Sequence, residues 1–82
     1  KRLIGLPGET IEVKDGTVYI NGIGLDEPYV KEPAAYNLDA LSLKSGEYFA
    51  LGDNRNNSLD SSTLGPIPDS AIIGVILPLG VK

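Results

Sequence analysis

The residues best suited to chemistry in this 82-residue sequence lie in two segments of unusual composition. The first is KRLIGLPGE (residues 1–9), and the second is GDNRNNSLD (residues 52–60). The sequence contains neither Cys nor His, which excludes thiolate nucleophiles, imidazole bases and metal sites built from those side chains within these residues. A general base that acts near neutral pH must therefore be Lys, Asp, Glu or Tyr.

The second segment consists of Gly and hydrogen-bonding residues, apart from Leu59. A solvated loop with Asn and Asp turns would explain this composition by itself. An EF-hand calcium loop fails on spacing, because a loop that began at Asp53 would place Arg55 and Leu64 where oxygen ligands are required. Residues 56–58, NNS, also fit the acceptor pattern for N-glycosylation, a short pattern that often arises by chance.

The elements that must position these segments are short strands joined by tight turns. Asp15-Gly16 and Asn21-Gly22 are turn dipeptides of the kind that close two-residue hairpins, since Gly tolerates a positive φ. Apolar and polar residues alternate on both sides of Asp15-Gly16, which predicts a β-hairpin. The predicted strands span residues 10–13, 17–20, 23–25, 46–51 and 71–77, the last of them buried.

Residues 26–44 are harder to assign. Pro28 and Pro33 exclude a regular helix or a central strand in the first part, and residues 37–43 are compatible with a strand or with one helical turn. No helical period of ten or more residues occurs in the sequence. The fold class predicted is therefore all-β, or mainly β, in a single domain.

Charge and hydropathy exclude other classes of protein. The net charge is -4 and the seven Lys and Arg residues form no run, which argues against nucleic acid as a partner. The longest apolar stretch, residues 71–81, is too short to cross a bilayer and is interrupted by Pro78. The sequence does not begin with Met, so we expect it to be a piece of a longer chain.

Together, the two segments resemble conserved boxes of the type I signal peptidases (leader peptidases), which are membrane-anchored serine proteases with a Ser/Lys dyad. KRLIGLPGE is similar to the KRxxGxPGD-like box that carries the family's catalytic lysine. GDNRNNSLDSSTLGPI is similar to the long GDNRxNSxDSRxWGxV-like box, and DGTVYINGIGLDEPYV between them resembles a variable β-hairpin insertion. The resemblance covers the chain except for the region around residues 33–44.

The resemblance implies that this chain is the C-terminal part of an extracytoplasmic domain built from antiparallel sheets, with a small hairpin insertion. Residues 1–8 and 45–82 would form catalytic-core strands, and about 9–44 would be the variable hairpin and insertion region. The family's nucleophile is a serine in a Ser-x-x-Met-type box upstream of the lysine. No Met occurs here and nothing precedes Lys1, so we expect the nucleophile serine to be absent from this chain and the chain alone to be inactive.

The resemblance also implies roles for particular residues. Lys1 would be the general base, which requires burial against apolar neighbours to lower its pKa from about 10.4. Ser58 would hydrogen-bond and orient the lysine amine, and Asp60 would belong to the same network. Arg2 and Asp53 would form an ion pair that ties the loop to the lysine-bearing strand. Without the resemblance, the default explanation would be surface charges for Lys1 and Arg2, and Asx or Ser turns for Ser58 and Asp60.

Two positions depart from the family's pattern. Ser62 stands where an Arg is usual, and Leu64 where an aromatic residue is usual. The Arg would pair with Asp60, so we expect Ser62 or a backbone N–H to replace it. The departures leave open a non-proteolytic, signal-peptidase-like assembly or binding module. A Ser/Lys autoprotease of the repressor-cleaving type is a further alternative, but that group lacks the long second box.

The partners implied are signal peptides of preproteins and a membrane, the latter through an N-terminal anchor outside this sequence. No cofactor and no metal are implied. The location implied is the extracytoplasmic side of a bacterial plasma membrane or of a related organelle membrane. Since core strands would be missing, we expect this chain to self-associate, to swap strands or to expose an apolar patch.

Overall fold

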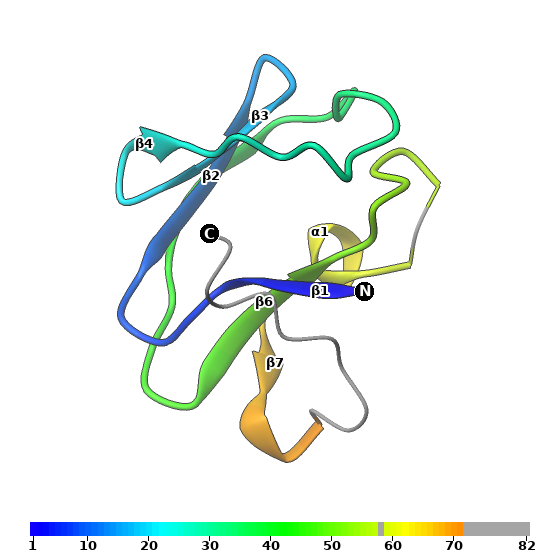
Figure 1. The fold of residues 1–82 in the computed structure, drawn as a ribbon. Helices are drawn as coiled ribbons and strands as arrows, with labels where there is room; N and C mark the ends of the chain where they lie inside the picture. The colour runs from blue at the N-terminus through cyan, green and yellow to red at the C-terminus, as the bar shows by residue number, and fades with distance from the viewer. Residues whose placement is uncertain (58, 72–82) are drawn as a thin grey trace.

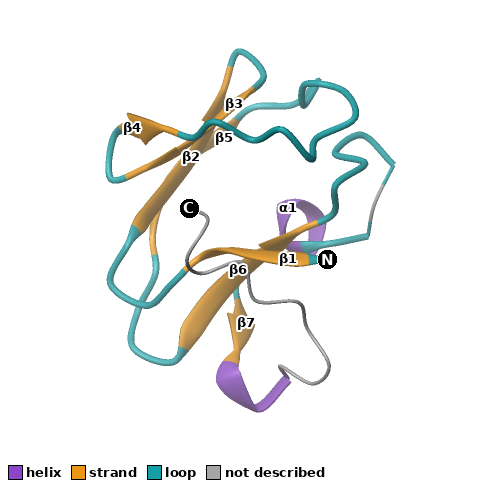
Figure 2. Ribbon diagram, viewed as in Figure 1, coloured by secondary structure: helices purple, strands orange, loops and turns teal. Residues whose placement is uncertain are grey.

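The computed structural model describes residues 1–57 and 59–71, in which short antiparallel strands form two sheets (Figures 1 and 2). In the first sheet the strand order is β1-β6-β7, and in the second it is β4-β3-β2-β5. The elements are β1 (Arg2–Gly5), β2 (Thr10–Lys14), β3 (Thr17–Ile20), β4 (Ile23–Gly24), β5 (Leu38–Ser42), β6 (Glu47–Leu51), the short helix α1 (Ser61–Leu64), β7 (Ile67–Pro68) and the 3₁₀ turn η1 (Asp69–Ala71). The prediction of a mainly β fold is confirmed.

The two predicted turns close the hairpins of the second sheet. Asp15 and Gly16 have φ angles of 51° and 82°, and Asn21 and Gly22 have 53° and 82°. Two successive positive φ angles define a type I′ turn, whose twist matches that of the flanking strands. The β2–β3 pairing therefore follows directly from local sequence, as predicted.

Gly16 is required for a second reason besides its positive φ. A Cβ atom at this position would lie 2.8 Å from the Cβ atom of Pro33, closer than van der Waals contact. We predict that Gly16→Ala lowers the free energy of unfolding by about 1–3 kcal/mol more than Gly22→Ala. Gly22 has the same φ of 82° and no neighbour within 4 Å of an added Cβ, so it isolates the steric effect. Urea denaturation measures both variants, and equal losses would contradict the prediction.

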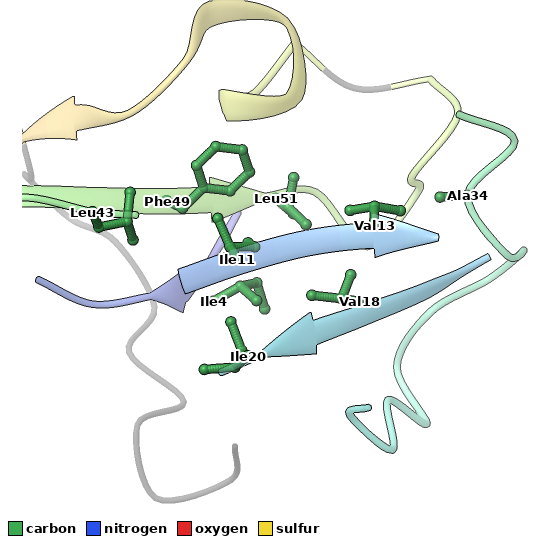
Figure 3. Close-up of a cluster of buried hydrophobic side chains, with 9 residues drawn as sticks. All are labelled: Ile4, Ile11, Val13, Val18, Ile20, Ala34, Leu43, Phe49 and Leu51. Carbon is green, nitrogen blue, oxygen red and sulfur yellow. The ribbon is translucent and has the colours of Figure 1, made fainter. Parts of the chain in front are cut away.

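The core lies between the two sheets (Figure 3). Alternate residues of β2 and β3 point inward, and they meet apolar residues of β1 and β6. The buried cluster consists of Ile4, Ile11, Val13, Val18, Ile20, Ala34, Leu43, Phe49 and Leu51. This packing is what holds the first sheet, which carries both predicted boxes, against the hairpin region.

Three predictions about local structure have different outcomes. Within residues 37–43, Leu38–Ser42 form a strand, β5, which pairs with β2. The polar loop expected over residues 52–62 ends earlier, because the helix α1, which was not predicted, begins at Ser61. The predicted strand at 71–77 lies outside the described residues beyond Ala71.

The described residues include no helix with the length and apolar character needed to span a membrane. Residues 10–42 supply all strands of the second sheet, and the first sheet is formed from the flanking segments. The division of these segments into an insertion and a catalytic core stays a prediction from the resemblance.

Candidate active site

The pairing of β1 with β6 brings the two predicted boxes together, although 42 residues (10–51) lie between them in the sequence. Arg2 is opposite Leu51 in this antiparallel pair, so Lys1 and Gly52 lie just beyond the same end of the ladder (Figure 1). The Arg2 guanidinium donates to both carboxylate oxygens of Asp53, with Nε–Oδ1 at 2.7 Å and Nη2–Oδ2 at 3.2 Å. The structure thus contains the ion pair that the resemblance implies.

Lys1 is exposed and immediately precedes β1. Ser58 lies outside the described residues. The expected hydrogen bond between the lysine amine and the Ser58 hydroxyl therefore stays a prediction.

Asp60 is buried, with 2% of its surface exposed, and it connects the helix to the end of β6. Its Oδ2 atom accepts a hydrogen bond of 2.9 Å from the Gly52 backbone N–H. Its Oδ1 atom accepts from the Ser62 backbone N–H at 2.9 Å, which makes Asp60 the N-cap of α1. An N-capping carboxylate at this position explains why a helix begins where the sequence predicted a loop.

Ser62 takes the place of the arginine that is usual in the resembled box. Its hydroxyl donates to Asp60 Oδ1 at 2.5 Å, and its backbone N–H binds the same oxygen. Both expected substitutes for the arginine, the Ser62 hydroxyl and a backbone N–H, are therefore present. They provide hydrogen bonds to the carboxylate but, unlike arginine, no countercharge.

Side chains of the second box also continue the hydrogen bonding of β6 beyond the end of β7. The paired residues of β6 and β7 are Glu47 with Pro68 and Tyr48 with Ile67. Further along β6, the Ala50 backbone N–H donates to Ser61 Oγ at 2.9 Å, as the Gly52 N–H does to Asp60. These side chains satisfy amides that would otherwise be unpaired at a sheet edge.

A buried ion pair between Arg55 and Glu27 lies behind this loop, and sequence reasoning missed it. Arg55 Nη1 and Nη2 donate to Glu27 Oε1 and Oε2 at 2.9 and 2.8 Å, and the exposed side-chain fractions are 2% and 8%. Arg55 Nε donates to the Gly52 carbonyl at 2.8 Å. The only signal in the sequence was Arg55 itself, a single Arg within a long polar segment. An Arg that is buried in such a segment needs an acidic partner from elsewhere in the chain.

Tyr29 connects the two ion pairs. Its hydroxyl donates to Glu27 Oε2 at 2.8 Å, and its ring centroid lies 4.0 Å from the Arg2 guanidinium carbon. The latter distance is in the range of cation–π contacts. Burial, followed by the hydrogen bond to Glu27, raises the pKa of Tyr29 to about 12. The hydroxyl therefore remains protonated, and able to donate, at physiological pH.

The raised pKa of Tyr29 predicts a loss of stability at high pH. In the unfolded chain a Tyr hydroxyl titrates near pH 10, whereas in the folded chain Tyr29 titrates at about 12. Between these values only the unfolded state releases the proton, so the free energy of unfolding falls as the pH rises. Because Tyr29 is partly exposed, we expect a loss of about 1 kcal/mol. Urea denaturation from pH 9 to 12 should show this loss relative to Tyr29→Phe, and parallel curves would contradict it.

The remaining alternatives for the second box find less support. The Asn56 side chain accepts from the Ala35 backbone N–H at 2.7 Å and donates to the Pro33 carbonyl at 3.0 Å. Both ends of its amide are thus used within the fold, which does not favour Asn56 as a glycosylation site. In the part of the chain that the structure describes, no group of three or more acidic side chains is suited to hold a metal ion.

Comparisons with known proteins agree with this geometry. Residues 1–78 match the family model described as signal peptidase, peptidase S26. A probable signal peptidase I-1 of Synechocystis is 51% identical over 74 residues, which are 90% of this chain and 38% of that protein. The chloroplastic thylakoidal processing peptidase 1 of Arabidopsis thaliana is 40% identical over 74 residues, 90% of this chain and 22% of that protein.

A solved structure shows the same fold. The crystal structure of a signal peptidase I from Enterococcus faecalis superposes with a TM-score of 0.77 at 37% identity, and the match covers 90% of this chain and 78% of that chain. The sequence of 82 residues spans between 22% and 38% of the lengths of the two curated relatives named above. From the family model and the solved structure together, the chain belongs to the signal peptidase family, peptidase S26.

Proposed function

We propose that this chain is the lysine-bearing part of a signal peptidase I, a serine endopeptidase that removes signal peptides from translocated proteins with a Ser/Lys dyad. The observation that carries the proposal is the meeting of the two boxes at one end of the β1–β6 pair. There the Arg2–Asp53 ion pair joins the residue after Lys1 to the residue after Gly52. The names of the similar proteins support the same activity.

In the proposed mechanism, Lys1 acts as the general base. Its neutral amine takes the proton of a serine hydroxyl, and the serine oxygen attacks the scissile carbonyl. The protonated lysine then donates this proton to the leaving amine, and water hydrolyses the acyl-enzyme. Donors in the rest of the protein stabilise the oxyanion. The substrate binds as an extended strand, with small side chains next to the scissile bond.

Lys1 is exposed in the described chain, whereas a neutral lysine at physiological pH requires an apolar environment. We therefore propose that residues outside this sequence, among them the segment that carries the serine, bury Lys1. Within this sequence, Asp60 and the Arg2–Asp53 pair hold the strand ends on which Lys1 depends. Ser58 is proposed to orient the lysine amine.

The proposed location is a membrane, with the catalytic domain on its extracytoplasmic side and an anchor outside this sequence. The proposed partners are signal peptides of preproteins. Self-association of the 82-residue chain also stays a prediction. Among the described residues, Leu59, which precedes α1, and Leu64, its last residue, are 66% and 63% exposed and are side chains we expect to take part.

A non-proteolytic binding module is the alternative that Ser62 and Leu64 left open. Its main argument was that Asp60 would lose a partner without the usual arginine. Since Ser62 supplies two hydrogen bonds to Asp60 Oδ1, this argument becomes weaker. Leu64 is exposed, and nothing in the described structure explains its departure from an aromatic residue.

The direct test is cleavage of a preprotein by the full chain from which this sequence comes, purified in detergent. We expect one cut at the junction between the signal peptide and the mature protein. The same preprotein with Trp at the residue before the junction is the control and should remain uncut. The 82-residue chain by itself should give no product. A full chain that leaves the unmodified preprotein intact would support the binding module instead.

A further inference from the structure

The segment formed by residues 26–36, which we name the strap, leaves the hairpin region after β4 and packs along the second box (Figure 1). Its contacts with the box are distributed over its length. Glu27 binds Arg55, the Lys31 backbone N–H donates to the Asp53 carbonyl at 3.3 Å, and Asn56 binds the backbone at Pro33 and Ala35. The strap is therefore attached to the box at its beginning, its middle and its end.

A connected series of side-chain contacts runs from the Arg55–Glu27 pair to the Arg2–Asp53 pair. Glu27 lies between the Arg55 guanidinium and the Tyr29 hydroxyl, and the Tyr29 ring lies against the Arg2 guanidinium. Arg2 in turn binds both oxygens of Asp53. Two strap residues thus contact both arginines that flank the proposed site. The Glu27 side chain is 8% exposed, so its contacts are shielded from solvent and strongly directional.

The same contacts act on the two strand ends next to Lys1. Arg2 is the residue after Lys1 and begins β1. Arg55 holds the Gly52 carbonyl, while Asp60 holds the Gly52 N–H, so both sides of Gly52 are fixed. A shift of Glu27 or Tyr29 would move Arg2 and Arg55 and, with them, the relative position of Lys1 and Gly52.

We infer that the strap is a positioning element of the active site, in which Glu27 and Tyr29 set the placement of Lys1 through Arg2 and Arg55. The inference rests on the proposed function only for the role of Lys1. Neither Glu27 nor Tyr29 is proposed to contact the substrate, and both act through Arg2 and Arg55. Their effect should resemble that of other supporting groups whose loss costs about tenfold in activity.

Two variants test the inference in the full chain. Tyr29→Phe keeps the ring against Arg2 but removes the hydrogen bond to Glu27, and Glu27→Gln removes one charge of the buried pair. We expect kcat for signal-peptide cleavage to fall about three- to tenfold in Tyr29→Phe, and more in Glu27→Gln, with KM changed less than about twofold. The acid limb of the pH–rate profile should move, because a displaced Lys1 has a different environment.

Matched controls are available in the same region. Tyr19→Phe alters a half-buried tyrosine on β3, and Glu32→Gln alters an exposed glutamate of the strap. Among the described residues, neither side chain has a hydrogen bond to lose. Both controls should keep the wild-type kcat and pH–rate profile.

A second measurement does not depend on activity. The amide proton of Gly52 should exchange with solvent at least about tenfold faster in Tyr29→Phe than in Tyr19→Phe under native conditions. If the wild-type full chain fails to cleave preproteins, the proposed function fails, but this exchange measurement still tests the strap. Unchanged exchange at Gly52, or a loss of kcat that only follows the fraction of unfolded protein, would overturn the inference.

Discussion

Replacement of Lys1 by alanine should lower signal-peptide cleavage by the full chain by about 10³-fold or more. Without the amine, the site loses the proposed general base for the attacking serine, and the sequence has no His or Cys to replace it. General-base catalysis typically contributes about 10²–10⁴-fold, and the loss of a base that acts together with its nucleophile is at the upper end. Initial rates with a purified preprotein measure the loss.

Two further variants separate the role of the base from that of the charge. Lys1→Arg keeps the positive charge, but a guanidinium is not deprotonated in proteins, so activity should be lost as in Lys1→Ala. Lys14→Ala removes an exposed lysine at the end of β2 and should leave the rate unchanged. Full activity in Lys1→Arg would contradict a base role for Lys1 while leaving the family assignment intact.

The second large effect concerns stability. Arg55→Met should lower the free energy of unfolding by about 3–5 kcal/mol, because it leaves the Glu27 carboxylate buried without its countercharge. Methionine retains much of the side-chain volume, so the loss reports mainly on charge and hydrogen bonding. The variant also leaves the Gly52 carbonyl without the Arg55 donor. Urea denaturation followed by circular dichroism measures the change.

The more exposed ion pair, Arg2 with Asp53, provides a comparison for the stability loss. The side chains of Arg2 and Asp53 are 25% and 35% exposed, so Arg2→Met should lower the free energy of unfolding far less than Arg55→Met does. The double variant Arg55→Met/Glu27→Leu should recover most of the loss of Arg55→Met, since no charge then remains buried. Similar losses in Arg55→Met and Arg2→Met, or no recovery in the double variant, would show that the buried pair does not carry this energy.

The hairpins show how far local sequence could predict the fold. Asp15-Gly16 and Asn21-Gly22 favour positive φ at both turn positions, and the flanking alternation sets which side chains are buried. No distant residue is needed for that prediction. The strand at residues 38–42 was ambiguous, because its side chains are largely exposed and its assignment depends on pairing with β2.

The helix α1 was missed for a related reason. It has four residues, and such a short helix has no hydrophobic period to detect. It forms because the Asp60 carboxylate caps its first turn while the same carboxylate holds the Gly52 amide of β6. The capping signal, Asp followed by two Ser residues, was present but is common in loops.

The sequence by itself determined the family, through two long boxes whose residue types and order are specific, and the hairpins, through turn residues that act locally. The Arg2–Asp53 pair was expected from the resemblance, but only the tertiary structure revealed the buried pair of Arg55 with Glu27. Glu27 comes from a segment without a regular pattern, and its partner lies 28 residues away, so only the packing of the strap on the box reveals the contact. The bond between Arg2 and Asp53 spans 51 residues, and β1–β6 pairing brings these two residues within reach. Long-range electrostatic partners depend on the position of whole strands, which no short sequence window contains.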